Sequence, residues 1–132
     1  MDPANDQADH LIDLTQKLLD SIATGDWDTY AKLCDDSLSC FEPEARGNLV
    51  HGMPFHKFYF DNLSHRMAVN TTIAAPHVRM LGPDAAVVSY VRLQQRMGSD
   101  GTPGTGRNEE TRVWEKQDGQ WKHVHFHRSE SQ

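Results

Sequence analysis

The sequence predicts an α+β domain in which the helices come first and the strands last. Apolar residues recur at helical spacing between Leu11 and Ile22, near the start of the chain. The second half reads instead as long strands separated by turn signals, including an Asp-Gly pair at 118–119. We therefore expect helices packed on one face of a curved antiparallel sheet, an arrangement that leaves a conical pocket as a natural ligand site.

Three helices are expected in the first half of the chain. The first should end at Gly25, because glycine readily adopts the left-handed conformation that stops a helix. Asp26 is suited to cap a second, short helix that carries Trp27 and Tyr30. Pro54 fits the first turn of a third helix, which we expect over residues 55–63.

Strands are expected from the middle of the chain onward. A short strand over residues 38–42 should end at Pro43. The glycine-rich segment 98–106 has the composition of a flexible turn between two long strands. The long strands are expected at 70–81, 85–97, 107–117 and 120–128.

The last two strands should form a hairpin around the Asp-Gly pair. A three-residue loop, 117–119, would place Arg112 and Arg128 on one apolar face, whereas a two-residue loop would put them on opposite faces. Grouping the apolar residues favours the three-residue loop. The residues that would share this inward face are Arg112, Trp114, Val124, Phe126 and Arg128. Buried guanidinium groups need an acidic partner, either from the chain or from a ligand.

The length of 132 residues and the composition predict one domain, over residues 8–129, with tails at 1–7 and 130–132. The net charge of -6 argues against a nucleic-acid or anionic-membrane partner, since both require a basic face. No apolar run approaches membrane-spanning length, and the acidic, polar start is unlike a signal peptide. Cys34 and Cys40 lack the spacing of a metal motif, so we expect two small buried thiols in a reducing, cytoplasmic setting.

Four segments carry a family resemblance: residues 41–50, 55–60, 109–114 and 124–128. They resemble, in order and across nearly the whole chain, the association (hub) domain of calcium/calmodulin-dependent protein kinase II. The resemblance implies the cone-shaped nuclear-transport-factor-2-like (SnoaL-like) fold. It also implies an oligomerisation hub, in which dimers close into two stacked rings, dodecamer-like, tetradecamer-like or larger, and gather kinase modules.

The sequence contains no Gly-rich kinase loop, catalytic loop or magnesium-binding motif, so no kinase activity is expected. Its N-terminal helix carries acidic residues on the polar face, so direct calmodulin binding is not expected either. The chain is then either an excised hub or a free-standing hub-like protein, and its clients could include kinase-bearing subunits. One segment departs from the hub pattern: around Ser64 the chain is about two residues shorter, and serine replaces a tryptophan at the pocket edge.

The resemblance also implies an arginine-lined pocket. Carried over position by position, its residues fall on Arg92, Arg112 and Arg128, with His56 and Tyr30 nearby. A cluster of forked guanidinium groups suits a small carboxylate or an acidic segment of a partner. The alternative is that carboxylates of the same chain neutralise the arginines, and both interpretations remain open. The candidate carboxylates are Glu42, Glu44, Glu109 and Glu110.

Two other functions are compatible with such a pocket: a small-molecule sensor, and an isomerase, cyclase or dehydratase that uses His56 with Tyr30 or Glu42. Three arginines should depress the pKa of a carboxyl group and weaken it as a base, so no catalytic residue and no cofactor is expected. His123, His125 and His127 alternate along one strand and could form a three-histidine zinc site. No carboxylate or cysteine at ligand spacing completes that site, so no metal is expected.

Overall fold

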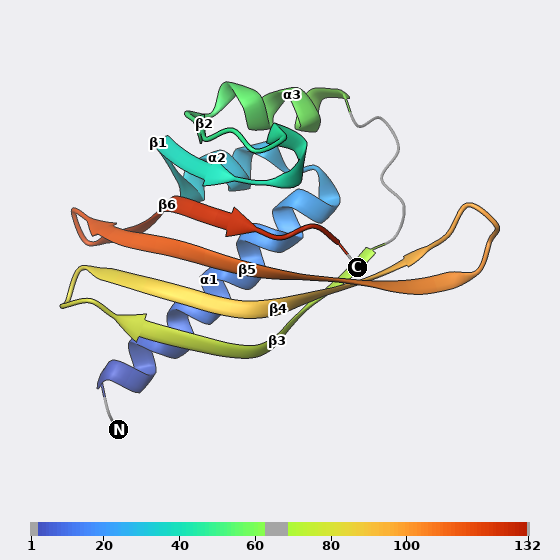
Figure 1. The fold of residues 1–132 in the computed structure, drawn as a ribbon. Helices are drawn as coiled ribbons and strands as arrows, with labels where there is room; N and C mark the ends of the chain where they lie inside the picture. The colour runs from blue at the N-terminus through green and yellow to red at the C-terminus, as the bar shows by residue number, and fades with distance from the viewer. Residues whose placement is uncertain (1–2, 63–68, 132) are drawn as a thin grey trace.

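The computed structural model describes residues 3–62 and 69–131, which form three helices and a curved six-stranded sheet (Figure 1). The α+β class predicted from the sequence is confirmed. The sheet order is β2-β1-β6-β5-β4-β3, and all neighbours are antiparallel except β1 and β6. The elements are α1 (Pro3–Thr24), α2 (Trp27–Leu33), β1 (Cys34–Phe41), the short 3-10 helix η1 (Pro43–Ala45), β2 (Val50–His51), α3 (Pro54–Asn62), β3 (Val69–Met80), β4 (Ala85–Met97), β5 (Pro103–Gln117) and β6 (Gln120–Arg128).

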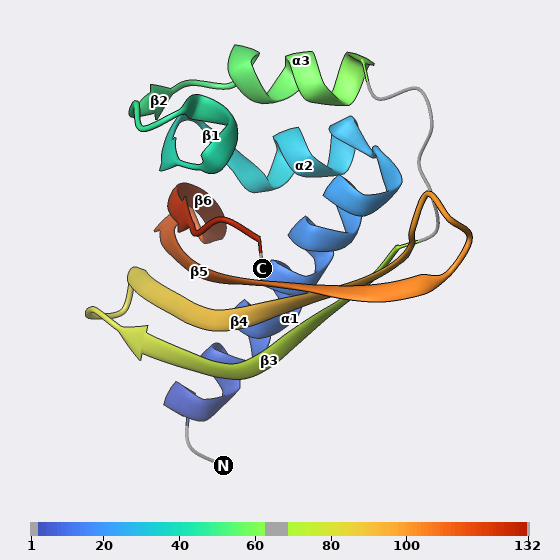
Figure 2. The ribbon, with the colours of Figure 1, turned by 45° about the vertical axis from the view of Figure 1, so that its right-hand side comes forward.

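Helix α1 runs diagonally across one face of the sheet (Figures 1 and 2). Its leucines Leu11, Leu18 and Leu19 are fully buried, and the indole Nε1 of Trp114 in β5 donates to Thr15 Oγ1 at 3.2 Å. The helix ends as predicted at Gly25, whose φ is +74°. Its start differs from the expectation of a tail over residues 1–7, because the helix begins at Pro3, where proline is favourable in the first turn.

The two short helices cover the β1 end of the sheet. The side chain of Asp26 caps α2 by accepting a hydrogen bond from the backbone N–H of Thr29 at 3.1 Å. Helix α3 starts at Pro54 as predicted and is described to Asn62, so its expected end at residue 63 lies outside the described residues. The departure from the hub pattern at Ser64 also lies outside them.

The β5–β6 hairpin corrects the predicted loop. Gln117 pairs with Gln120, so the loop holds two residues rather than three. Asp118 and Gly119 both have positive φ, +51° and +79°, as a type I′ turn requires. The register then shifts by one between Val113 and Trp114. Beyond that bulge Arg112 lies opposite Phe126, so the two side chains share a face as predicted, although the predicted loop would have placed Arg112 opposite Val124.

Two strands are longer than predicted. Strand β1 begins at Cys34 rather than at residue 38, and it follows α2 directly. Strand β5 begins at Pro103, so residues 103–106 belong to a strand and the flexible turn is shorter than the predicted 98–106. Met97 pairs with Pro103 at the tip of this long β4–β5 hairpin. Glycine-rich composition indicated a turn, but backbone pairing with β4 continues through Gly104 and Gly106.

The core lies between the helices and the sheet. Trp114, Leu38, Val88 and Cys40 are fully buried there, and both cysteines are free thiols, as expected. None of the helices in the described part of the chain is long and apolar enough to cross a membrane.

Candidate functional site

A cavity of about 550 Å³ opens between the helices and the sheet. All five residues predicted to surround a pocket line this one cavity, each from a different element. They are Tyr30 of α2, His56 of α3, Arg92 of β4, Arg112 of β5 and Arg128 of β6. The structure therefore brings the predicted set together, although the roles of these residues follow only from their surroundings.

The innermost part of the site is built around Glu110, whose side chain has no exposed surface. Its Oε1 accepts hydrogen bonds from Tyr90 Oη at 2.5 Å and from Arg112 Nη2 at 2.9 Å. Its Oε2 accepts from Arg92 Nη1 at 2.8 Å and from Asn108 Nδ2 at 3.0 Å. Two of the three predicted arginines are therefore neutralised by one carboxylate of the same chain.

The charges of this network reinforce one another. Burial opposes ionisation of Glu110, but Arg112 and then Arg92 outweigh it and hold the pKa of the carboxyl well below its usual range. The guanidinium of Arg112 also lies over the ring of Phe126, 4.4 Å from its centroid. Arg112 is thus held by contacts on several sides, and it is a fixed part of the cavity wall.

Arg128 is less tightly held by neighbouring groups than Arg92 and Arg112 are. Its side chain is 16% exposed, and Nη2 forms ion pairs with Glu44 and, at 3.6 Å, with Oε2 of Glu42. Glu44 is itself 36% exposed, so its contact with Arg128 can exchange with solvent or with another anion. Of the arginines predicted for the pocket, Arg128 is the one whose partners lie nearest to water.

The prediction that arginines depress the pKa of the pocket carboxyl groups holds for Glu110 but is wrong for Glu42. Burial, and then the neighbouring charge of Glu44, raise the pKa of Glu42 to about 7 despite Arg128 and Arg112. Desolvation and the charge of Glu44 together outweigh the attraction of the two arginines. Burial, followed by the charge of Arg112, lowers the pKa of His56 to about 4, so this imidazole is neutral at pH 7.

The three histidines of β6, His123, His125 and His127, do not project from one face of the strand. The bulge at the β5–β6 register shift turns His123 into the core, where it is fully buried beside Trp114. His125 instead contacts Ser39 Oγ through Nδ1 at 2.7 Å, and His127 is exposed. Alternation along a regular strand would have kept all three on one face, so the zinc site considered for them is contradicted by the bulge.

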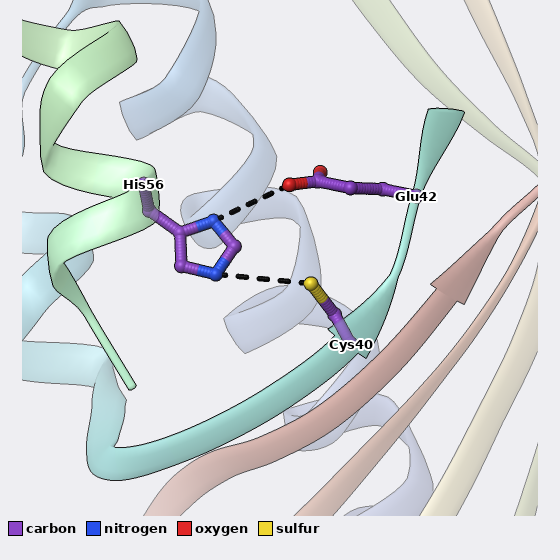
Figure 3. Close-up of side chains that lie close together, drawn as sticks. All are labelled: Cys40, Glu42 and His56. Atoms are coloured by element: carbon purple, nitrogen blue, oxygen red, sulfur yellow. Dashed lines mark hydrogen bonds and ion pairs between the residues drawn. The ribbon is translucent and has the colours of Figure 1, made fainter. Parts of the chain in front are cut away.

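A different group could hold a metal ion. Cys40, Glu42 and His56 each offer one ligand atom, and these atoms lie within 4.8 Å of one another (Figure 3). Linear spacing could not reveal this group, because His56 comes from α3 and reaches β1 only through the fold. No sequence pattern indicated Arg96 and Gln94 either, which line the cavity from β4.

Comparisons with known proteins agree with this fold. The family model described as "Calcium/calmodulin dependent protein kinase II association domain" matches residues 7–132. The chain is 52% identical over 123 residues to the calcium/calmodulin-dependent protein kinase type II alpha chain of Drosophila melanogaster. That match covers 92% of this chain but 23% of the relative, so the chain spans about a quarter of the relative's length.

Two solved structures are similar to this fold. The CamKII hub homology domain of Chlamydamonas reinhardtii is 52% identical, with a TM-score of 0.89 over 93% of this chain and 97% of that one. An NTF2-like protein of Rhodospirillum rubrum is 22% identical, with a TM-score of 0.72 over 90% of this chain and 96% of that one. The second likeness concerns the fold alone. The chain therefore belongs to the calcium/calmodulin-dependent protein kinase II association domain family and has its NTF2-like α+β fold.

Proposed function

We propose that this chain is an oligomerisation hub, whose copies pair into dimers that close into a double ring. The observation that carries the proposal is the association-domain match over residues 7–132, nearly the whole chain. The structure adds support in its large exposed apolar side chains. Phe41, Leu49 and Phe58 are 38%, 57% and 61% exposed. They belong to the end of β1, the approach to β2, and α3, which lie together at one end of the molecule (Figures 1 and 2).

Exposed aromatic and aliphatic side chains favour burial against another surface. A second copy of the chain supplies such a surface, and closed symmetry buries every copy of the contact. Client modules tethered to the assembly, including kinase-bearing subunits, would then meet at a high effective concentration. The two buried, free thiols fit assembly in a reducing compartment such as the cytoplasm.

Native mass spectrometry tests the hub proposal. We expect a single species larger than a dimer, at an even multiple of the 15.0 kDa chain. A variant with Phe58→Glu should reduce this mass, because a charge in an apolar contact between subunits is costly. Glu109→Gln, at a 66%-exposed position on β5, is the control that should leave the mass multiple unchanged.

We also propose that the cavity binds a small carboxylate, or an acidic segment of a partner, at Arg128. The incoming carboxylate would replace Glu44, whose side chain is the more exposed of the two partners of Arg128. A guanidinium group can bind it through two parallel hydrogen bonds. Arg96, which is exposed and lines the same cavity, adds a second positive charge near the opening.

Calorimetry with succinate tests this pocket. Arg128→Gln should weaken succinate binding by about 10- to 150-fold, because a hydrogen bond to a charged group contributes about 1.5–3 kcal/mol. Arg107→Gln is the matched control, since Arg107 is a half-exposed arginine paired with Glu109 outside the cavity. Equal succinate affinities in the two variants would contradict the carboxylate site. The native mass should stay unchanged in both.

One observation favours acid–base catalysis as a second candidate function. A carboxyl group with a pKa of about 7, as in Glu42, is suited to act as a general base. Against this, Glu42 is already engaged by Arg128 and His56. We therefore expect binding without turnover. NMR of 2-oxoglutarate in deuterium oxide tests this: exchange of its carbon-bound protons that disappears in Glu42→Gln would show catalysis instead.

A further inference from the structure

We propose that Cys40, Glu42 and His56 form a binding site for one zinc ion in the wall of the cavity. The site requires neither ring assembly nor a carboxylate ligand, so it goes beyond the function proposed above. The chain supplies a thiol, a carboxylate and an imidazole there, three groups that bind zinc in proteins.

The site lies where α3, which carries His56, packs beside the end of β1, which carries Cys40. Cys40 and Glu42 are two positions apart, so their side chains project from the same face of the extended chain toward His56 (Figure 3). Cys40 Sγ lies 3.8 Å from His56 Nε2, and Glu42 Oε1 lies 3.6 Å from His56 Nδ1. Cys40 is fully buried and His56 is 6% exposed, so the ligand atoms are held by packing.

These separations suit the ion. Zinc–sulfur and zinc–nitrogen bonds of about 2.3 and 2.1 Å at a tetrahedral angle place sulfur and nitrogen about 3.6 Å apart. The observed 3.8 Å between Cys40 Sγ and His56 Nε2 is close to that value. Glu42 contacts the other ring nitrogen of His56, Nδ1, so zinc binding requires its carboxylate to turn toward Nε2; the ligand atoms of the three residues already lie within 4.8 Å of one another. Glu42 and His56 line the cavity, so the fourth coordination position would face the cavity and hold water.

Neighbouring charges are compatible with a cation. The three arginines of the cavity wall, Arg92, Arg112 and Arg128, face three carboxylates, Glu42, Glu44 and Glu110. Arg128 lies 3.6 Å from Glu42 Oε2 and leaves Oε1 on the side of His56. Such an outer partner orients a metal-binding carboxylate. On binding, the ion replaces the proton of the Cys40 thiol and any proton on the Glu42 carboxyl group, and these protons leave to water through the cavity.

The chain contains a matched control pair. Cys34 Sγ lies 3.5 Å from His123 Nδ1, and both residues are buried. In the described part of the chain, the Cys40 group is the only set of three ligating residues with this proximity, so Cys34 and His123 lack a third ligand. A metal that requires three ligands should therefore bind at Cys40 and not at Cys34.

Titration of the full, metal-free chain with Co²⁺ and Zn²⁺ tests the proposal. Co²⁺ should produce a near-ultraviolet thiolate-to-cobalt band that saturates at one ion per chain and is displaced by Zn²⁺. Cys40→Ser should abolish the band and weaken zinc binding at least about 100-fold, because a ligand is lost. Cys34→Ser should leave both unchanged. Glu42→Gln should keep the thiolate band but weaken zinc binding about tenfold or more.

Three results would overturn the site: no thiolate band, a band lost in Cys34→Ser but kept in Cys40→Ser, or zinc binding without a band. The last result would mean that exposed histidines, such as His127, take up the ion. If Cys40→Ser fails to fold, Glu42→Gln decides, because unchanged zinc affinity in that variant would also overturn the site. Succinate binding and native mass are separate readouts, so failure here leaves the proposed function standing.

Discussion

Replacing Glu110 with glutamine tests the energetics of the buried network most sharply. The carboxylate has no exposed surface and accepts hydrogen bonds from Tyr90, Arg92, Asn108 and Arg112. Glutamine keeps the shape but removes the charge, and it replaces one acceptor oxygen with a donor that faces other donors. Both guanidinium groups would then be buried without an anion.

The magnitude follows from the two positive charges that Glu110 neutralises. Removing one partner of a buried ion pair costs about 3–5 kcal/mol. Because two arginines share this one carboxylate, we expect Glu110→Gln to lower the free energy of unfolding by an amount near the upper end of that range. Glu109→Gln is the control: its side chain is 66% exposed and lies 3.5 Å from Arg107, so its cost should stay below about 0.5 kcal/mol.

Urea unfolding of the three proteins at one protomer concentration measures the difference, since assembly adds stability by mass action. The arginines hold the folded-state pKa of Glu110 below its unfolded value, so its contribution is present above that value and lost only in strong acid. The difference between wild type and Glu110→Gln should therefore be constant from about pH 5.5 to 8. A cost below about 1 kcal/mol, or one equal to that of Glu109→Gln, would refute the reasoning.

Two further predictions use the same assay. The folded-state pKa of Glu42 is raised to about 7, so its stabilising contribution is present in acid and is lost as the pH rises through 7. With a chelator present, wild type should lose about 2 kcal/mol relative to Glu42→Gln between pH 5.5 and 8, and a pH-independent difference would contradict the raised pKa. Gly119→Ala should cost about 1 kcal/mol because its φ of +79° disfavours a side chain. Gly104→Ala, where φ is ordinary and space is open, should cost less, and equal costs would show that φ is not the cause.

The sequence predicted the elements better than their details. The sequence was sufficient to predict α1 and α2, because their signals are local: the helical spacing of apolar residues, Gly25 and the cap at Asp26. The β5–β6 hairpin shows what the sequence could not predict. Its predicted loop length was wrong, yet Arg112 and Phe126 still share a face, because a bulge compensates for the shorter loop. A bulge of this kind depends on packing on both faces of the sheet, which a linear pattern does not contain.

Some features of the candidate site were predicted from the sequence and others were not. The resemblance identified the five predicted cavity residues, and the carboxylates expected to neutralise the arginines correctly included Glu110. The raised pKa of Glu42 could not be predicted, because it depends on how deeply the fold buries that carboxyl group. The cluster of Cys40, Glu42 and His56 was missed for a related reason: it exists only because the fold brings His56 of α3 next to the end of β1.

The native mass of the purified chain tests the central claim most directly. The hub account predicts one species above a dimer, at an even multiple of 15.0 kDa, that persists on dilution. The multiple itself would give the number of subunits in the closed ring. A monomer or a simple dimer at every concentration would contradict the account and leave the cavity as the functional part of the molecule.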